Sequence, residues 1–145
     1  MEKCEIREMM VAMELARRKI LQPYFQGLGL SIGQPRILNK LYEKDGITQR
    51  ELADRCLLDV ASISRALDKL EEAGYLTREK HPDCRRSFMI VLTAAGREKA
   101  RAVNSKFNEL DERIWEGIGE AEMDAFLTCA GKILHNMVLT DTLSK

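Results

Sequence analysis

The chain has 145 residues, of which 45% are hydrophobic and 32% charged, so it is long enough for one domain with a real core and short for two. This length argues against a two-domain enzyme. Its 23 basic and 23 acidic side chains cancel, and a net charge of zero at first argues against nucleic-acid binding, since a dedicated binder usually carries a basic excess.

No stretch is apolar for the length that crossing a bilayer requires, and the N-terminus is acidic where a signal peptide needs a positive and then an apolar region. The expected location is therefore the cytoplasm. The four cysteines, at positions 4, 56, 84 and 129, lack a CxxC spacing, and with two histidines they form no zinc-binding pattern. We expect free thiols, no metal and no cofactor.

Residues from Ile6 to about Phe25 predict one amphipathic helix, because apolar side chains recur at every third or fourth position. These are Ile6, Met9, Met10, Met13, Ala16, Ile20 and Tyr24. Methionine adapts to irregular shapes, so the stripe could line a ligand site, but such stripes more often pack against a core or a second subunit. Gly27, Gly29 and Gly33 follow in a loop, and with no strand before them they are not a dinucleotide-binding fingerprint.

The next helix is predicted to open at Ser31 and Gln34, which resemble a capping box, with Pro35 tolerated in the first turn. Residues 44–46 end it. Its buried side is expected to consist of Ile37, Leu38 and Leu41. This helix should pack under the pair that follows.

Thr48 and Glu51 have the spacing of a second capping box and predict a short helix. Its apolar side consists of Leu52, Ala53 and Cys56. Asp59 then offers a fresh N-cap for a second helix, which Gly74 closes because glycine readily adopts a left-handed conformation. The inward residues of the second helix are Ile63, Leu67 and Leu70.

The opposite side of this second helix, called the outer face below, carries short hydroxyls, then long cations, and no large apolar residue. It consists of Ala61, Ser62, Ser64, Arg65, Asp68 and Lys69. Such a face suits a DNA major groove, where small residues let a helix sit deep and arginine pairs with guanine. Any solvated helix face can look the same, and short helix-turn-helix patterns also occur by chance. The candidate DNA contacts of the helix pair are Gln49, Arg50, Ser62, Ser64, Arg65 and Lys69.

A hairpin is predicted after Gly74, with strands at 75–80 and 87–92 around a turn signal at Pro82 and Asp83. Its tip carries two further candidate contacts, so we expect a flexible cationic loop that reaches a neighbouring minor groove or its phosphates. These contacts are Arg85 and Arg86. Helix, turn, helix and hairpin together form a winged helix.

The neutral sum hides a segregation of charge along the chain. Residues 78–86 contain four cations against two acids, whereas acidic side chains gather between residues 109 and 124. A locally basic tip can steer the protein toward phosphates, with a modest electrostatic contribution.

Thr93 is placed to cap a long helix that continues to Trp115 and is interrupted by Gly117 to Gly119. A last helix from about Glu120 has a wider apolar stripe than one helix can cover. The stripe consists of Met123, Phe126, Leu127, Ala130, Ile133, Leu134, Met137 and Val138. The terminal helices therefore need a partner, and we expect a homodimer.

The predicted fold is mainly α and forms a single domain over residues 1–145. A winged helix-turn-helix with a short two-stranded wing spans 31–93, and dimerisation helices occupy 1–27 and 94–145.

Three segments in this order, ITQRELA, SISRALDKLEEAGYLTRE and HPDCRRSFMIVLTAAG, resemble the MarR family of bacterial transcriptional regulators. The wing of that family typically reads aspartate-proline-x-aspartate-arginine-arginine before leucine-threonine-x-x-glycine. His81 and Cys84 stand in place of the two aspartates. The second aspartate is thought to orient a wing arginine in that family, and Asp83 is the candidate substitute here. The residues that fit are Pro82, Arg85, Arg86, Leu92, Thr93 and Gly96.

The resemblance implies a homodimeric, sequence-specific binder of double-stranded DNA that represses transcription at a pseudo-palindromic operator and is released by a small molecule or another signal. Family members often take phenolic or other amphipathic anions between the dimer helices and the winged helix. The candidate residues for such an effector here are Met13, Arg17, Tyr24 and Phe25.

Other functions stay open from the residues alone. The neutral net charge favours a winged-helix module that binds protein instead of DNA. An enzyme has little support, since the sequence contains no P-loop, metal-ligand cluster or placeable nucleophile. Cys84 lies among Arg85, Arg86 and His81 and could sense oxidants, because positive charge lowers the pKa of a thiol, although a surface cysteine there also fits simple drift.

Overall fold

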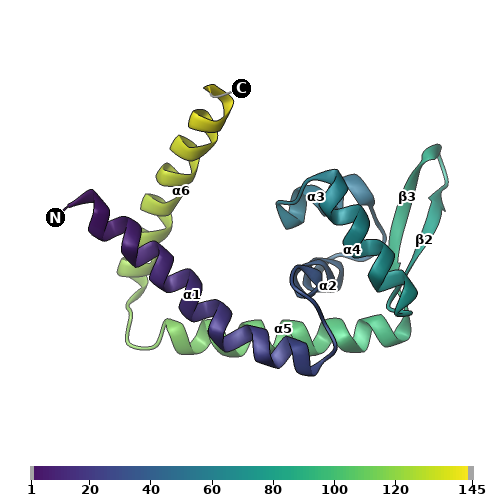
Figure 1. Ribbon diagram of the computed structural model, residues 1–145, viewed down its shortest axis with the longest axis horizontal. Coiled ribbons are helices and arrows are strands. Elements are labelled where there is room, and N and C mark those ends of the chain that lie inside the picture. Colours follow the sequence, from purple (N-terminus) through teal and green to yellow (C-terminus); the bar gives the residue numbers. More distant parts are fainter. Residues whose placement is uncertain (1, 144–145) are drawn as a thin grey trace. The chain divides into compact units, whose positions relative to one another are not determined.

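The computed structural model describes residues 2–143, apart from the side chain of Arg85. Helices predominate in this range, and three strands form one small sheet (Figure 1). In chain order the elements are α1 (Lys3–Gly27), α2 (Gln34–Glu43), β1 (Ile47–Thr48), α3 (Gln49–Cys56), α4 (Val60–Glu72), β2 (Leu76–His81), β3 (Cys84–Leu92), α5 (Ala94–Ile114) and α6 (Glu120–Leu143). The mainly helical fold predicted from the sequence is confirmed.

The chain divides into two compact units, Met1–Asn108 and Glu109–Lys145, and α5 contributes to both. The first unit holds the helix pair, the sheet and α1. In the second unit, the rings of Trp115 and Phe126 meet edge to face with their centroids 5.7 Å apart.

The core of the first unit is built from the inward sides of α2, α3 and α4, from the sheet and from the part of α5 that belongs to this unit. Its largest fully buried side chains include Ile37, Leu38, Leu41, Leu52, Ile63, Leu67, Leu70, Leu76, Ile90 and Val103. Each inward position predicted for α2, α3 and α4 is buried, because the helical period gathers those side chains on one side.

The sheet has three antiparallel strands in the order β1-β3-β2. Ile47 of β1 pairs with Ile90, and Leu76 of β2 pairs with Leu92. The predicted two-stranded wing is the hairpin of β2 and β3, and β1 adds to the sheet a third strand that the sequence did not predict. β1 is too short to leave a sequence pattern and is defined by its pairing with β3, a strand far along the chain.

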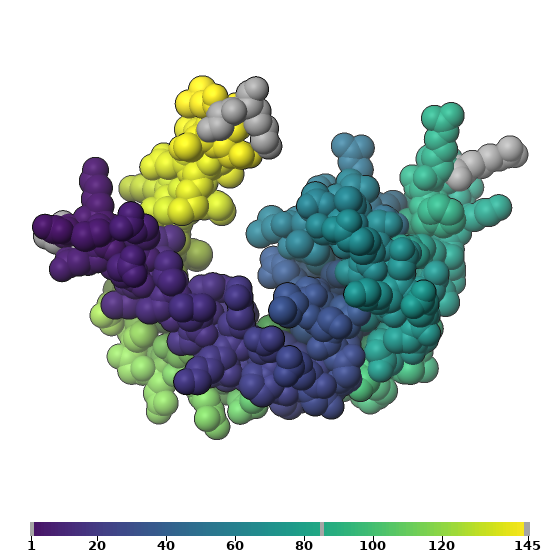
Figure 2. Space-filling model, viewed as in Figure 1, coloured from purple at the N-terminus to yellow at the C-terminus, as the bar shows by residue number. Residues whose placement is uncertain are grey.

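The hairpin turn is tighter than predicted. β3 begins at Cys84, which pairs with His81, so the turn consists of Pro82 and Asp83. Arg85 and Arg86 consequently belong to a strand and not to a loop, because pairing with β2 resumes at Cys84, although the register shifts between the Lys80–Phe88 and His81–Cys84 pairs. The hairpin projects from the body of the first unit (Figure 2).

Helices α1 and α6 bury few of their apolar side chains. In α1, Leu21 and Phe25 are buried, whereas Met9 and Met13 of the predicted stripe are 62% and 49% exposed. No described residue of α6 is buried. Among residues 2–143, no helix combines the length and apolar character that crossing a membrane requires.

Candidate nucleic-acid interface

The two helices of the helix-turn-helix begin at capped N-termini. The backbone N–H of Glu51 donates to Thr48 Oγ1 over 3.1 Å, and the backbone N–H of Ser62 donates to Asp59 Oδ1 over 2.7 Å. Hydrogen bonds from the backbone and hydroxyl of Ser62 lower the pKa of Asp59. Both predicted N-caps are confirmed, and each satisfies a backbone donor that the helix start leaves without a partner.

The other hydrogen bond of the predicted capping box, from the backbone N–H of Thr48 to the Glu51 carboxylate, is not formed. The Glu51 carboxylate lies 3.0 Å from Lys44 Nζ and 3.4 Å from Arg55 Nε. The hydrogen bond from Lys44 is the main reason why the pKa of Glu51 is lowered. Two cations within reach hold the side chain away from the backbone N–H of Thr48, so Glu51 ties α3 to the end of α2.

The turn between α3 and α4 contains Leu57 with φ of 56°. This left-handed conformation is costly for a branched side chain, by roughly 1–2 kcal/mol. The side chain of Leu57 is 80% exposed, so its burial does not offset this conformational cost. The left-handed conformation at this position could not be predicted from the sequence, because the residue is neither glycine nor asparagine.

The outer face of α4 is open to solvent at its cations. Arg65 and Lys69 are exposed, while Ser62 and Ser64 are half-buried. The Ser62 hydroxyl donates to Asp59 Oδ2 over 3.0 Å and so contributes to the helix cap. Arg65 is therefore the side chain of this face that is best able to reach a base edge.

Gln49 and Arg50 occupy the first turn of α3, where Gln49 is half-buried and Arg50 exposed. Their backbone donors point out of the helix start, as an approaching phosphate requires. In the wing, Arg86 is exposed on β3. The side chain of Arg85 lies outside the described part of the structure.

The two wing residues that depart from the family pattern both take part in hydrogen bonds. His81 Nδ1 accepts from the backbone N–H of Asp83 over 3.1 Å across the turn. The Ser87 hydroxyl lies 3.6 Å from Cys84 Sγ and is the main cause of a lowered pKa at this exposed thiol. Among the described residues, hydrogen bonds from Ser87 and from the backbone of Arg86 are what lower this pKa.

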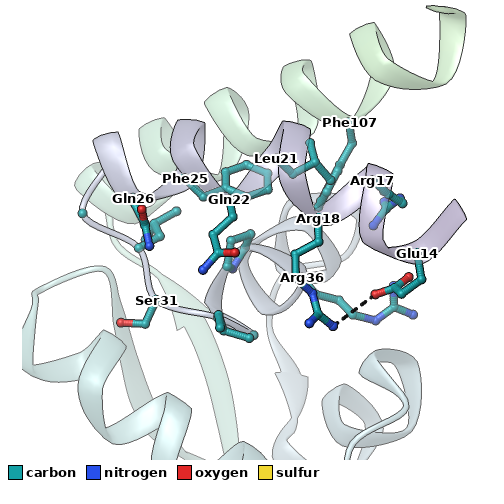
Figure 3. Close-up of a pocket in the computed structure, with 15 residues that line it drawn as sticks. Glu14, Arg17, Arg18, Leu21, Gln22, Phe25, Gln26, Ser31, Arg36 and Phe107 are labelled. Carbon is teal, nitrogen blue, oxygen red and sulfur yellow. Dashed lines mark hydrogen bonds and ion pairs between the residues drawn. The ribbon is translucent and has the colours of Figure 1, made fainter. Parts of the chain in front are cut away.

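An open pocket of about 740 Å³ lies in the first unit, between α1, the loop after it, α2 and α5 (Figure 3). The rings of Phe25 and Phe107 meet edge to face in its wall, with centroids 5.4 Å apart. The volume suits a small organic molecule. The lining residues are Glu14, Arg17, Arg18, Leu21, Gln22, Phe25, Gln26, Gly29, Leu30, Ser31, Ile32, Gly33, Pro35, Arg36 and Phe107.

Cations outnumber acids in this pocket. Arg18 Nη2 lies 3.5 Å from Glu14 Oε1, and the Arg17 guanidinium lies over the Phe107 ring, 5.4 Å from its centroid. Arg36 reaches out of the pocket, and its guanidinium donates to the carbonyl oxygens of Cys56 and Arg55 at the end of α3 over 3.0 and 3.4 Å. Arg36 thus joins the pocket to the helix-turn-helix.

Of the four predicted effector residues, Arg17 and Phe25 line this pocket. Met13 and Tyr24 lie on α1 outside its lining, and Lys106 Nζ lies 4.9 Å from the centroid of the Tyr24 ring. Arg18 and Arg36 also line the pocket and were not predicted from the sequence. No local pattern marks them, because the pocket forms only where α1, α2 and α5 meet.

Comparisons with known proteins agree with this geometry. The model of the MarR family matches residues 30–88. A MarR-family transcriptional regulator from Silicibacter pomeroyi is 30% identical, with a TM-score of 0.76 over 94% of this chain and 96% of that one. The structure of the MepR–DNA complex from S. aureus has the same fold at 21% identity, with a TM-score of 0.81 over 89% of this chain and 94% of that one.

Curated relatives point the same way. The transcriptional repressor YetL of Bacillus subtilis is 29% identical over 121 residues, which cover 81% of this chain and 72% of the relative. The segment that the family model matches contains α2, the helix pair and most of the wing. The chain belongs to the MarR family of transcriptional regulators.

Proposed function

We propose that the protein is a homodimeric transcriptional repressor that binds a pseudo-palindromic double-stranded operator and is released by a small amphipathic anion. The observation that carries this proposal is the exposed outer face of α4, capped at Asp59 and followed directly by a projecting hairpin with Arg86 on its surface. A protein that acts on operators works where the chromosome is, so we place it in the cytoplasm.

In this proposal, different residues contact the DNA bases and the DNA phosphates. Arg65, with Ser62 and Ser64 beside it, enters the major groove, where arginine pairs bidentately with guanine. Gln49, Arg50 and Lys69 contact phosphates that flank the groove. Wing residues Arg85 and Arg86 reach the adjacent minor groove or its phosphates.

Dimerisation follows from the exposed apolar sides of the terminal helices. Exposed large apolar residues of α1 include Ile6, Met9, Met10, Met13, Leu15 and Ile20, and those of α6 include Phe126, Leu127, Leu134, Met137, Val138 and Leu139. Two such faces on one small chain exceed what monomers usually expose. A second copy covers them under two-fold symmetry, which also presents two α4 helices to the two halves of a palindrome.

The pocket beside α1 suits the releasing ligand. A carboxylate or phenolate pairs with Arg17 and Arg36, while an aromatic body packs on Phe25 and Phe107. An anion that pulls the Arg36 guanidinium away from the carbonyl oxygens at the end of α3 weakens a link between pocket and helix pair. Ligand binding thereby alters how the helix-turn-helix is held.

Selection of bound duplexes from a random pool tests the proposal. We expect an enriched inverted repeat with half-sites about one helical turn apart, roughly 34–36 Å. Binding that shows no sequence preference, or no duplex binding in moderate salt, would replace this function with that of a winged-helix module for protein partners, which the neutral net charge of the chain also allows.

A further inference from the structure

We propose that Arg78 of β2 is a positioning residue that holds the outer face of α4 at a set angle to the wing, so that the two contact one duplex together. The inference rests on the proposed DNA-binding function. The sequence suggests another role, because Arg78 stands at the head of the cationic run 78–86 and looks like one more phosphate contact.

Arg78 is bound to α4 at several points. Its Nη1 lies 2.7 Å from Asp68 Oδ1 and 3.5 Å from Glu71 Oε1, and its Nη2 donates to the Ser64 carbonyl oxygen over 3.1 Å. The backbone N–H of Arg78 donates to Glu71 Oε2 over 3.1 Å. Glu71 thus binds both ends of the residue, and the start of the wing is tied to two successive turns of the helix.

The burial of the guanidinium separates this cluster from an ordinary surface ion pair. The side chain of Arg78 is 17% exposed, whereas those of Asp68 and Glu71 are 58% and 43% exposed. Exposed pairs contribute little because water competes for both partners. A shielded guanidinium with three acceptors fixes an angle as well as a distance, since its donors lie in one plane.

The cluster also affects the net charge of the outer face of α4, which is the surface proposed to contact DNA. Asp68 lies on the outer face, three residues after Arg65 and four after Ser64, so all three side chains share one side of α4. A bare carboxylate there would repel phosphates. Arg78 offsets that charge from within the fold, which leaves Arg65, Lys69 and the wing cations to face the duplex.

A fixed angle between α4 and the wing matters because the two elements are proposed to bind one duplex at once. When one element is bound, the other is held near its own groove at a high effective concentration. If the wing swings freely, base readout by α4 and contact by Arg86 become separate events. Selectivity for the operator then falls, while loose binding to any duplex persists.

The test compares Arg78→Ala with the unaltered protein on a duplex selected from a random pool and on a scrambled duplex, by fluorescence anisotropy at several salt concentrations. We expect the ratio of the two affinities to fall by about tenfold, within the range for residues of one shared network. Affinity for the scrambled duplex and its salt slope should stay the same. Arg78→Lys should recover part of the ratio, since an amine reaches fewer of the acceptors.

Two outcomes would overturn the proposal. A salt slope on the scrambled duplex that drops by about 0.9 would make Arg78 a phosphate contact. A lowered melting temperature with an unchanged affinity ratio would make it a structural residue only. If the unaltered protein itself shows no preference between the two duplexes, the proposed function fails, and that failure is visible before any variant is measured.

Asp68→Ala removes the exposed partner of Arg78, and it keeps the proposal testable if Arg78→Ala does not fold. It should lower the affinity ratio, and the double variant should lose less than the sum of the two single losses, because both changes remove the contact between Arg78 and Asp68. An unchanged ratio in Asp68→Ala would contradict the proposal. Arg97→Ala is the matched control: its 2.7 Å pair with Asp45 ties α5 to the loop before β1, and the ratio should not change.

Discussion

Arg65 is the residue on which operator recognition is expected to depend most. It is exposed on the outer face of α4, in the second turn of the helix. Arg65→Ala should lose roughly 1–3 kcal/mol of binding per half-site contact and relax preference at one base position. Arg101→Ala, which removes an exposed cation of α5, is the control and should bind as before. Repeating the duplex selection with both variants checks the prediction, and an unchanged consensus with Arg65→Ala would rule out its reading role.

The wing cations should behave differently from Arg65. Loss of Arg86 should weaken binding to selected and scrambled duplexes alike, because a phosphate contact carries no sequence information. Each such contact contributes a slope of roughly 0.9 in log affinity against log salt, so Arg85→Ala/Arg86→Ala should flatten the plot by up to twice that amount. Titrations across salt concentrations measure this, and a loss confined to the selected duplex would instead make the wing a base reader.

Cys84 tests the link between hydrogen bonding and thiol chemistry. The Ser87 hydroxyl stabilises the thiolate and keeps the pKa of Cys84 below its ordinary value, so Ser87→Ala should raise that pKa. The reaction rate with iodoacetamide as a function of pH, in a Cys4→Ser/Cys129→Ser background, gives the pKa. Buried Cys56, whose pKa burial raises, should stay unreactive. An unchanged profile in Ser87→Ala would show that the hydroxyl has no such effect.

At the scale of elements, the junction between the wing and α5 is held by close backbone contacts. The Thr93 hydroxyl donates to the Gly74 carbonyl oxygen over 2.6 Å and accepts from the backbone N–H of Gly96 over 3.0 Å. A Cβ on Gly96 would collide with the backbone carbonyl of Tyr75. Both Gly96 and the Tyr75 carbonyl belong to the backbone, so the collision could be relieved only by moving α5 or the hairpin as a whole.

Gly96→Ala should therefore destabilise the fold by about 1–3 kcal/mol, the usual cost of overpacking, or more. Gly27→Ala at the end of α1 is the matched control, since a Cβ there meets no atom within 4 Å, and its effect should lie between zero and a gain of roughly 1 kcal/mol. Urea unfolding followed by circular dichroism measures both. Equal stability of the two variants would show that the Tyr75 carbonyl can move aside.

At the scale of the whole molecule, the terminal helices should hold two copies together. Sedimentation equilibrium at micromolar concentration should give twice the monomer mass of 16.5 kDa. Leu134→Asp, which places a charge on the apolar side of α6, should shift the protein toward that monomer mass. Leu57→Asp also alters an exposed leucine but lies in the helix-turn-helix, so it should remain dimeric. A monomer mass for the unaltered protein would refute the dimer and remove the basis for a palindromic site.

Much of the helix-turn-helix could be predicted from the sequence by itself. The caps at Thr48 and Asp59 and the closing Gly74 depend on residues a few positions apart. The inward residues of α2, α3 and α4 follow from the helical period. Such signals are local, so a chain read in order contains them in full. The ordering of the motifs was enough to point to the family.

Tertiary structure alone decided the features that depend on distant partners. β1 exists because β3 pairs with it, and Arg86 lies within a strand because pairing with β2 resumes at Cys84, beyond a register shift. In the sequence Arg78 looks like a wing cation, but in the structure it is bound to Asp68 and Glu71 of α4. Arg17 and Arg36 are far apart in the sequence and line one pocket only because of how the chain folds. The role of a charged side chain depends on the charges and carbonyl groups that folding places beside it. The hydrophobic periodicity of the sequence does not indicate which groups those are.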